Sequence, residues 1–464
     1  MGEYVMARHR TPPASRAPLL RLGAVAVLSC AAACAPAASG ERGGADAATV
    51  RPEVAVDEGR DILQTDLALN LATREGTATL TLAASTSRAA SFEVGDLSID
   101  TVEDEAGPLK FRTDRPARLD VGVPATGAPV RLTVRYRFQQ HAQLDGWLPA
   151  SGVTFLWPYF CGNLFPCHSA PAEGGRFSLT VKGVAPGLLA VHPDVIPADA
   201  PAYMPAIAVG AYTRLDLGRT SAGTRVSAWH LPGQSTKAKS GTAHLRDVFD
   251  FYERTYGPYL FGDEAGSVSA DWAGGSFGGM EHHPFWHVGK DDFGSEEVHA
   301  HEAAHGWFGD GVRIACWEDF VLSEGLATYL STRGLSDSGV DLWPQFECDL
   351  KDTCDPASGP PTAALPSTCG VIDLLHDPLW SLVPYMKGAF FLREVADVLG
   401  VEAVDRVLAA FYAAHAGRAA HMQDLLDALD RVAGGKAAEV ASVATKWLRT
   451  AECPSEVSEL CPSK

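Results

Sequence analysis

The hydrophobic pattern of this chain changes near its middle from a period of two residues to a helical period. From about residue 50 to 217, apolar and polar residues alternate, most clearly at 131–138 and again at 79–82 and 176–181. Alternation of this kind is typical of strands with one buried face. From about residue 236 the spacing is helical, over 242–256, 296–308, 323–333, 385–399, 401–414 and 422–447. The sequence therefore predicts an α+β chain, with a β-rich amino-terminal domain at 50–217 and a mainly helical domain at 218–464.

One extended segment interrupts the helical half. Residues 266–272 are extended in character and run directly into the glycine-rich stretch 274–279. Glycine in a strand often marks a close approach of another backbone. We therefore expect an edge strand beside a cleft.

Residues 1–34 predict an export signal. Arginines at 8, 10, 16 and 21 are set against one acidic residue at 3, and residues 22–34 are then uncharged and mostly apolar. This apolar run is shorter than the roughly 20 residues that a membrane-spanning helix needs. Residues 35–49 are rich in Ala and Gly, which predicts a flexible tether.

Two cysteines close the apolar run. Cys30 and Cys34 each follow three small or apolar residues, and each resembles the lipidated cysteine of bacterial lipoproteins, with Cys34 slightly preferred. The alternative is a cleaved signal without a lipid. We therefore expect an exported protein attached to a membrane of a bacterial cell envelope through lipidated Cys34 or Cys30, or otherwise a periplasmic or secreted one.

The charge balance excludes one class of partner. The chain has 38 Lys and Arg against 57 Asp and Glu, a formal net charge of −19. Because the leader is basic, this acidity belongs to the rest of the chain. Most of its surface would repel a phosphate backbone, so we expect no nucleic-acid partner.

The remaining cysteines are even in number, which in an oxidising compartment predicts disulfides. We expect two local pairs, Cys161 with Cys167 and Cys453 with Cys461, while the other pairings cannot be read from the sequence. Cys316 is expected to be disulfide-bonded or buried rather than catalytic. No CxxC pair occurs, which argues against a cysteine-type structural zinc site. The cysteines outside the leader are Cys161, Cys167, Cys316, Cys348, Cys354, Cys369, Cys453 and Cys461.

The strongest chemical signal is an HExxH motif at residues 301–305, within a helical pattern that contains no proline. Four residues turn a helix by about 400°, so His301 and His305 lie on one face and can share a metal ion. Glu302 lies one step round the helix, where it can reach a water molecule at that metal. Two neutral imidazoles and a carboxylate are a ligand set of catalytic zinc. The histidines at 282, 283, 287 and 299 lack this spacing and are expected to be surface or pocket residues.

The residues around the motif resemble the gluzincin zinc aminopeptidases of the aminopeptidase N and leukotriene hydrolase type. Their signature is HExxH, 18 residues and then Glu, and here 18 residues separate His305 from Glu324. The resemblance spans about 50–448. The matching segments are 305–310, like the family's HxWFG; 322–325, like LNEG; 278–282, like GxMEN; 383–388, like VPYxKG; and 165–167 with 176–180, like the FPC region and the strand after it.

This resemblance implies a thermolysin-like catalytic domain that binds one Zn²⁺ per chain. The implied ligands are His301, His305 and Glu324, with Glu324 opening a second helix. Glu302 is implied to be the general base and acid. Tyr385 is implied to stabilise the oxyanion.

The same resemblance implies a peptide-binding surface beside the metal. Glu281 would hold the free α-ammonium group of a substrate. The backbone of Gly278, Gly279 and Met280 could pair with the substrate as an added strand. We therefore expect peptide substrates.

Four departures from the family pattern bear on this interpretation. His282 replaces the Asn of GxMEN, and Trp157 occupies the position from which the first domain usually supplies a second amine-binding residue. Ser331 replaces a Glu that often supports the zinc ligands, for which Asp319 is a possible substitute. The chain also ends near the end of the catalytic domain, where large family members continue, which predicts a more open pocket.

The function predicted from the sequence is zinc-dependent hydrolysis of amino-terminal residues from peptides. Because Trp157 weakens the recognition of a free amine, one alternative is a zinc endopeptidase or other hydrolase. Another is a surface lipoprotein that binds peptides without catalysis, which Glu302 and Tyr385 argue against.

Overall fold

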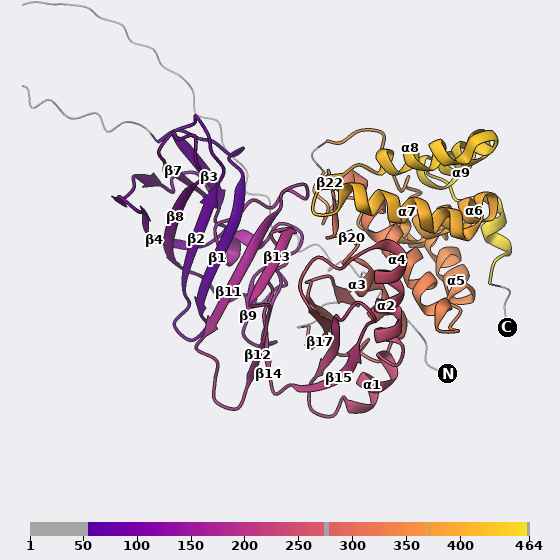
Figure 1. The fold of residues 1–464 in the computed structure, drawn as a ribbon, viewed down its shortest axis with the longest axis horizontal. Helices are drawn as coiled ribbons and strands as arrows, with labels where there is room; N and C mark the ends of the chain where they lie inside the picture. The colour runs from indigo at the N-terminus through magenta and orange to yellow at the C-terminus, as the bar shows by residue number, and fades with distance from the viewer. Residues whose placement is uncertain (1–53, 273–277, 371, 462–464) are drawn as a thin grey trace, which may run out of the picture. The chain divides into compact units, whose positions relative to one another are not determined.

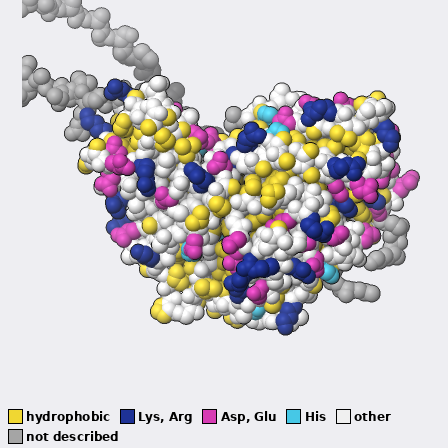
Figure 2. Space-filling view, in the orientation of Figure 1, with side chains coloured by type: hydrophobic (Ala, Val, Ile, Leu, Met, Phe, Trp, Pro, Cys, Tyr) yellow, Lys and Arg dark blue, Asp and Glu magenta, His cyan; other side chains and the backbone are white. Residues whose placement is uncertain are grey.

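In the computed structural model, residues 54–272, 278–370 and 372–461 are described. Strands dominate its first half and helices its second, as the fold class predicted from the sequence requires (Figure 1). The expected export signal and tether, with Cys30 and Cys34, lie outside the described residues. None of the helices in the described part of the chain combines the length and apolar content that crossing a membrane requires. On the face drawn in Figure 2, basic and acidic side chains are interspersed.

A seven-stranded sheet forms the frame of the β-rich region. Inward-facing Leu67, Ala78 and Val134 are buried, and their registers place them side by side across three strands. The alternation seen in the sequence therefore reflects one buried and one exposed face. The strand order is β13 (Val195–Ala200), β11 (Gly175–Lys182), β1 (Ile62–Asn70), β2 (Glu75–Leu82), β8 (Val130–Arg137), β4 (Ser98–Asp104) and β5 (Gly107–Pro108).

Two smaller sheets complete this region. One has the order β3 (Ala89–Glu93), β7 (Arg118–Gly122) and β6 (Phe111–Arg112); the other has the order β12 (Leu189–Val191), β14 (Ala208–Gly210), β10 (Val153–Thr154) and β9 (Trp147–Leu148). The loop after β10 carries the Cys161–Cys167 disulfide, as predicted. A bridge between Glu93 and Cys167 ties that loop to β3.

A five-stranded sheet begins the second half, in the order β15 (Thr213–Arg219), β16 (Arg225–His230), β17 (Glu264–Ala270), β19 (Phe285–Gly289) and β18 (Gly279–Met280). The predicted edge strand at 266–272 is wrong, because β17 pairs with β16 on one side and β19 on the other. The edge strands of this sheet are β15 on one side and the short β18 on the other. The boundary at 217 stays a prediction, and β15 runs across it.

The helices differ from the predicted ones, and the two at Ser235–Gly241 and Trp343–Thr353 fall outside every predicted range. The last four residues of 296–308 lie outside the helix, and 422–447 is divided near Gly434 and Gly435. Glu324 does not open its helix, because that helix already begins at Phe320. The helices are α1 (Ser235–Gly241), α2 (Leu245–Tyr256), α3 (Glu296–Ala304), α4 (Phe320–Asp337), α5 (Trp343–Thr353), α6 (Val383–Leu399), α7 (Val401–His415), α8 (Met422–Ala433) and α9 (Ala437–Ala444).

Long-range disulfides hold the helical half together. Cys316 pairs with Cys369, Cys348 with Cys461 and Cys354 with Cys453. The predicted Cys453–Cys461 pair is therefore wrong. Cys461 instead bonds to Cys348 within α5, and Cys453 bonds to Cys354, directly after that helix. Both bonds form because the carboxyl-terminal segment runs back along α5.

Helices α4 and α6 touch through two glycines. A Cβ atom added to Gly388 would lie 2.5 Å from the Cα of Gly325, and one added to Gly325 would lie 2.8 Å from the Cα of Gly388. No side chain fits at either position without moving a helix backbone. The contact places Tyr385, one turn earlier in α6, beside Glu324 of α4.

We expect Gly388→Val to lower the free energy of unfolding by about 1–3 kcal/mol, because the new methyl groups overpack the contact between the helices. The matched control is Gly435→Val, at a position where nothing lies within 4 Å of an added Cβ. Chemical unfolding followed by circular dichroism measures both variants. Equal stability of the two variants would contradict the proposed packing.

Candidate metal centre

The first two candidate ligands come from α3. Ser295 caps this helix by accepting from the backbone N–H of Val298, and Glu296 and Glu297 place negative charge at its amino end. The helix ends at Ala304, but His305 keeps helical backbone angles of −60° and −22°. The two imidazoles therefore remain four residues apart on one face, and their Nε2 atoms lie 3.2 Å from each other.

The third candidate ligand comes from α4. Oε2 of Glu324 lies 3.1 Å from Nε2 of His301 and 3.4 Å from Nε2 of His305. All three side chains are buried. A tetrahedral zinc ion with bonds of about 2.0–2.1 Å requires its ligand atoms to be about 3.3 Å apart. The donor set and its spacing therefore fit one zinc ion.

The electrostatics of this cluster favour a cation. Burial lowers the pKa of His305, but Glu324, Glu281 and Glu302 outweigh it and raise the pKa to about 10. Burial likewise raises the pKa of Glu324, but His305 and His301 lower it to about 2. The buried carboxylates thus favour a positive charge at His305, which a bound metal ion would supply in place of a proton.

The outer nitrogens of the two histidines are held by neighbouring residues. Nδ1 of His305 lies 3.1 Å from the carbonyl oxygen of Phe308 and 3.3 Å from Oγ of Ser323. Nδ1 of His301 lies 3.4 Å from Oγ1 of Thr328. These contacts direct each Nε2 lone pair towards the cluster. Sequence reasoning missed all three, although Ser323 and Thr328 lie one residue before and four residues after Glu324.

The suggestion that Asp319 supports the zinc ligands is wrong. Its carboxylate accepts hydrogen bonds from Nδ1 of His421 and the backbone N–H of Met422 instead. Ser331, at the position of the family's Glu, donates to the carbonyl oxygen of Thr328. Ser331 therefore acts only on the helix that carries Thr328.

Glu302 faces the same cluster from α3. Its carboxylate lies within 4.8 Å of ligand atoms of Glu281 and His305. Burial is the main cause that raises the pKa of Glu302 well above its usual range, and Glu281 and Glu324 add to it. A Cβ added to Gly279 would overlap this carboxylate, so a glycine is needed for β18 to pass beside it.

Tyr385 covers the cluster from α6. Its ring stacks on that of His301, with the centroids 5.7 Å apart and the planes 16° apart. Pro384 in the first turn suits the start of this helix. Burial, with Glu324 and Glu281 adding to it, raises the pKa of Tyr385 well above its usual range, so the hydroxyl keeps its proton.

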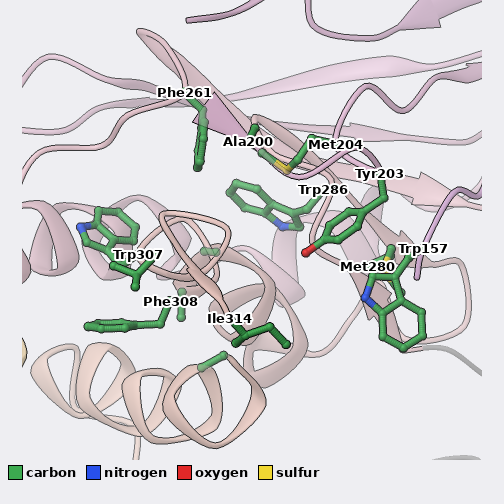
Figure 3. Close-up of a cluster of buried hydrophobic side chains, with 14 of the residues drawn as sticks. Trp157, Ala200, Tyr203, Met204, Phe261, Met280, Trp286, Trp307, Phe308 and Ile314 are labelled. Atoms are coloured by element: carbon green, nitrogen blue, oxygen red, sulfur yellow. The ribbon is translucent and has the colours of Figure 1, made fainter. Parts of the chain in front are cut away.

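Glu281 is buried beside residues that the sequence did not single out. Burial raises its pKa to about 7, with His305 opposing the rise and Glu324 adding to it. Tyr203, from the loop between β13 and β14, donates its hydroxyl proton to Oδ1 of Asp310 at 2.9 Å, and the same hydroxyl opposes the rise in the pKa of Glu281. The β-rich region thus reaches the site through Tyr203. Figure 3 draws Tyr203 with Met280 and Trp157 in one buried cluster.

Gly278, Gly279 and Met280 lie at the border of the site. Gly279 pairs with Val288 and Met280 with His287, which makes β18 an edge strand. Among the residues that the structure describes, no strand pairs with its outer edge. Residues 274–277 of the glycine-rich stretch lie outside the described residues.

The four histidines expected at the surface or in a pocket are all buried. His282, which replaces the family's Asn, has its Nδ1 atom 3.4 Å from Nδ1 of His287. Burial lowers the pKa of both, so both are neutral. His283 and His299 bond to the carbonyl oxygens of Glu302 and Phe293. These histidines support the core around the site.

Trp157 is also buried, in an aromatic cluster. Its ring centroid lies 4.6 Å from that of Trp380 and 6.1 Å from that of Trp317. Phe320 packs against both Trp380 and Tyr385. This position therefore offers an apolar ring where the family pattern has an amine-binding polar group.

Comparison with known proteins agrees with this geometry. Residues 289–447 match the model of the Peptidase family M1 domain. The chain is 31% identical to Aminopeptidase N of Streptomyces lividans over 160 residues, covering 32% of this chain and 18% of that protein. It is 24% identical to Aminopeptidase M1-C of Oryza sativa subsp. japonica over 318 residues, covering 61% of this chain and 35% of that protein. The chain thus spans less than half the length of these relatives.

Solved structures share the fold. The M1 zinc metallopeptidase from Deinococcus radiodurans superposes with a TM-score of 0.72 at 19% identity, covering 86% of this chain and 96% of that one. Yeast LTA4 hydrolase in complex with bestatin superposes with a TM-score of 0.70 at 20% identity, covering 85% of this chain and 68% of that one. Residues 289–447 are thus similar to the Peptidase family M1 domain, and the chain shares the fold of the solved M1 zinc metallopeptidase and LTA4 hydrolase structures.

Proposed function

We propose that this chain is a zinc-dependent aminopeptidase that removes amino-terminal residues from peptides. The observation that carries the proposal is the convergence of His301, His305 and Glu324 at 3.1–3.4 Å, with the carboxylate of Glu302 within 4.8 Å of a ring nitrogen of His305. The names of the relatives support it, as does a structure of the D. radiodurans enzyme bound to a Tyr-Ser-Ala substrate.

His301, His305 and Glu324 would hold one Zn²⁺ per chain. When bound, this ion supplies Lewis-acid chemistry, which polarises a carbonyl group and acidifies water. The protein holds the ligands in a buried place, where charge interactions are stronger than in water.

Glu302 performs the proton transfers. Its buried carboxylate accepts a proton from the attacking water and returns that proton to the nitrogen of the departing amine. The raised pKa of Glu302 suits a group that must both accept and donate. Tyr385 donates its hydroxyl proton in a hydrogen bond to the oxyanion that develops on the scissile carbonyl.

Glu281 selects substrates that have a free amino terminus. Its carboxylate would pair with the α-ammonium group of the first residue and fix the scissile bond at a set distance from Glu302. The free edge of β18 would hold the substrate backbone as an added strand. Both groups orient the peptide before reaction.

We expect Glu302→Gln to lower kcat about 10²–10⁴-fold, because the amide cannot accept the proton of water. The matched control is Glu297→Gln, on the same helix. Burial, with Asp349 and Asp292 adding to it, raises the pKa of Glu297 to about 7, so a neutral amide resembles its protonated form. Turnover of aminoacyl chromogenic substrates and zinc content measure both variants.

Removal of zinc with a chelator should abolish this activity, and one equivalent of zinc should restore it. Turnover that survives the chelator, or full activity of Glu302→Gln, would overturn the mechanism.

We expect Tyr385→Phe to lower kcat about 10²-fold with little change in KM, because the lost hydrogen bond forms only as the oxyanion develops. Tyr412→Phe makes the same change at a buried tyrosine whose hydroxyl donates to the carbonyl oxygen of Pro258. It should retain activity. A Tyr385→Phe enzyme with normal kcat would remove Tyr385 from the mechanism.

The indole of Trp157 has no oxygen acceptor for an α-ammonium group, which favours the second candidate, an endopeptidase, and one comparison separates the two. An aminopeptidase should not cleave N-acetylated peptides, and Glu281→Gln should lower the ratio of kcat/KM for free over acetylated peptides at least about tenfold. Matched peptide pairs measured by mass spectrometry give this ratio. Equal cleavage of both members by the native chain would favour the endopeptidase.

A further inference from the structure

A second group of metal-binding side chains lies outside the catalytic cluster. One donor atom from each of Cys316, Cys369, Asp319 and His421 lies within 4.8 Å of every other. Oδ2 of Asp319 lies 2.7 Å from Nδ1 of His421 and 3.2 Å from Sγ of Cys316. Sγ of Cys369 lies 4.0 Å from that oxygen and 3.7 Å from that nitrogen. We call these four residues the Cys316 cluster.

The four side chains come from three parts of the chain. Cys316 and Asp319 directly precede α4, Cys369 belongs to the segment between α5 and α6, and His421 directly precedes α8. Three separate parts therefore meet at one point.

Contacts other than the Cys316–Cys369 bond hold these parts in place. The backbone N–H of Gly370 donates to Oε1 of Glu318, and that of Met422 donates to Oδ1 of Asp319. The strand pair β21 (Val312–Ile314) and β22 (Ala419–Ala420) brings Ile314 opposite Ala420. Breaking the disulfide alone would leave the two cysteines close together.

The Cys316–Cys369 disulfide has a carboxylate and an imidazole beside its sulfur atoms. The sulfur atoms of a disulfide carry no proton, so neither can donate to the Asp319 oxygen that lies 3.2 Å away. Apart from the backbone N–H of Met422, which bonds to Oδ1 of Asp319, His421 is the only one of the four side chains that can donate a proton to the others. Several electron-pair donors therefore point at one place with few protons to share, and a cation can satisfy them.

The spacing also fits a metal ion. With zinc bonds of about 2.3 Å to sulfur and 2.0–2.1 Å to nitrogen, tetrahedral ligand atoms lie about 3.3–3.7 Å apart. The sulfur–oxygen and sulfur–nitrogen separations are already 3.2–4.0 Å. Two pairs must move apart: the sulfur atoms from bonding distance to about 3.7 Å, which the Cα atoms, 6.0 Å apart, allow, and Oδ2 of Asp319 and Nδ1 of His421 from 2.7 Å to about 3.3 Å.

We propose that reduction of the Cys316–Cys369 disulfide converts the Cys316 cluster into a second metal site, which binds zinc or another thiophilic divalent cation. A dithiol reductant supplies two electrons and two protons, breaks the sulfur–sulfur bond and itself becomes a disulfide. Binding of the metal then releases both thiol protons. Two thiolates, an imidazole and a carboxylate complete the coordination.

The proposed site links Cys316 and Cys369 in both the oxidised and the reduced protein. A disulfide joins Cys369 to the start of α4 under oxidising conditions, and coordination joins the same residues after reduction. Because α4 also carries Glu324, the start of this helix would stay anchored in either case.

Cobalt(II) added to the full chain tests this proposal. A cobalt–thiolate bond gives a near-ultraviolet charge-transfer band, and the catalytic cluster has no sulfur ligand that could produce it. We expect the band in protein reduced with an excess of dithiol and freed from it anaerobically, saturating at one thiolate-bound cobalt per chain. It should be absent from the unreduced protein.

Two double variants are compared under the same reduction. Cys316→Ser/Cys369→Ser should lose the band, although it keeps the thiols of the other disulfides. Cys161→Ser/Cys167→Ser should retain it. The Cys161→Ser/Cys167→Ser variant removes both cysteines of a smaller group, Glu93 with Cys161 and Cys167, which has three donors and no histidine. No band in the reduced native chain, or an undiminished band in Cys316→Ser/Cys369→Ser, would overturn the proposal.

His421→Asn provides a test that does not remove the cysteines. His421 is the cap residue of α8, and Asn can also cap a helix, so the fold should be kept. We expect cobalt to bind the reduced variant at least about tenfold more weakly than the native chain, because one ligand is lost. Unchanged affinity would exclude His421 and the proposed four-ligand site. None of these readouts depends on peptidase activity.

Discussion

Buried negative charge is the constraint around which the catalytic half is built. Glu281, Glu302 and Glu324 lie close together out of water, and each disfavours the ionisation of the others. Burial of several carboxylates is costly unless a cation compensates them. A zinc ion held by His301, His305 and Glu324 would supply the positive charge that these carboxylates favour.

This arrangement depends on close packing of helices. Two histidines on α3 can share a metal only if a carboxylate arrives from a second helix, and Tyr385 can cover them only if a third lies against the second. The contact of Gly325 with Gly388 gives the third helix that position. The β-rich region contributes Tyr203, which supports Asp310 and Glu281 from outside the helical half. The proposed amine site therefore uses both halves of the chain.

The disulfides of the helical half crosslink segments that are far apart in the sequence. Three disulfides join segments that are 53–113 residues apart in the sequence. Crosslinks over such distances restrict the unfolded chain more than local ones do. One of them lies within a set of metal-binding side chains, so the same residues can serve two kinds of crosslink.

The sequence by itself determined the local features. A period of two or of 3.6 residues identified β8, β11 and most helices, and HExxH placed two imidazoles on one helix face, because these patterns depend on residues near one another in the chain. Glu324, Glu281 and Tyr385 came from resemblance to a family. Only the tertiary structure decided that β17 is internal, that Cys453 pairs with Cys354, and that Thr328, Ser323 and Tyr203 support the site. Those contacts join segments far apart in the sequence, and no local pattern records which segments will meet.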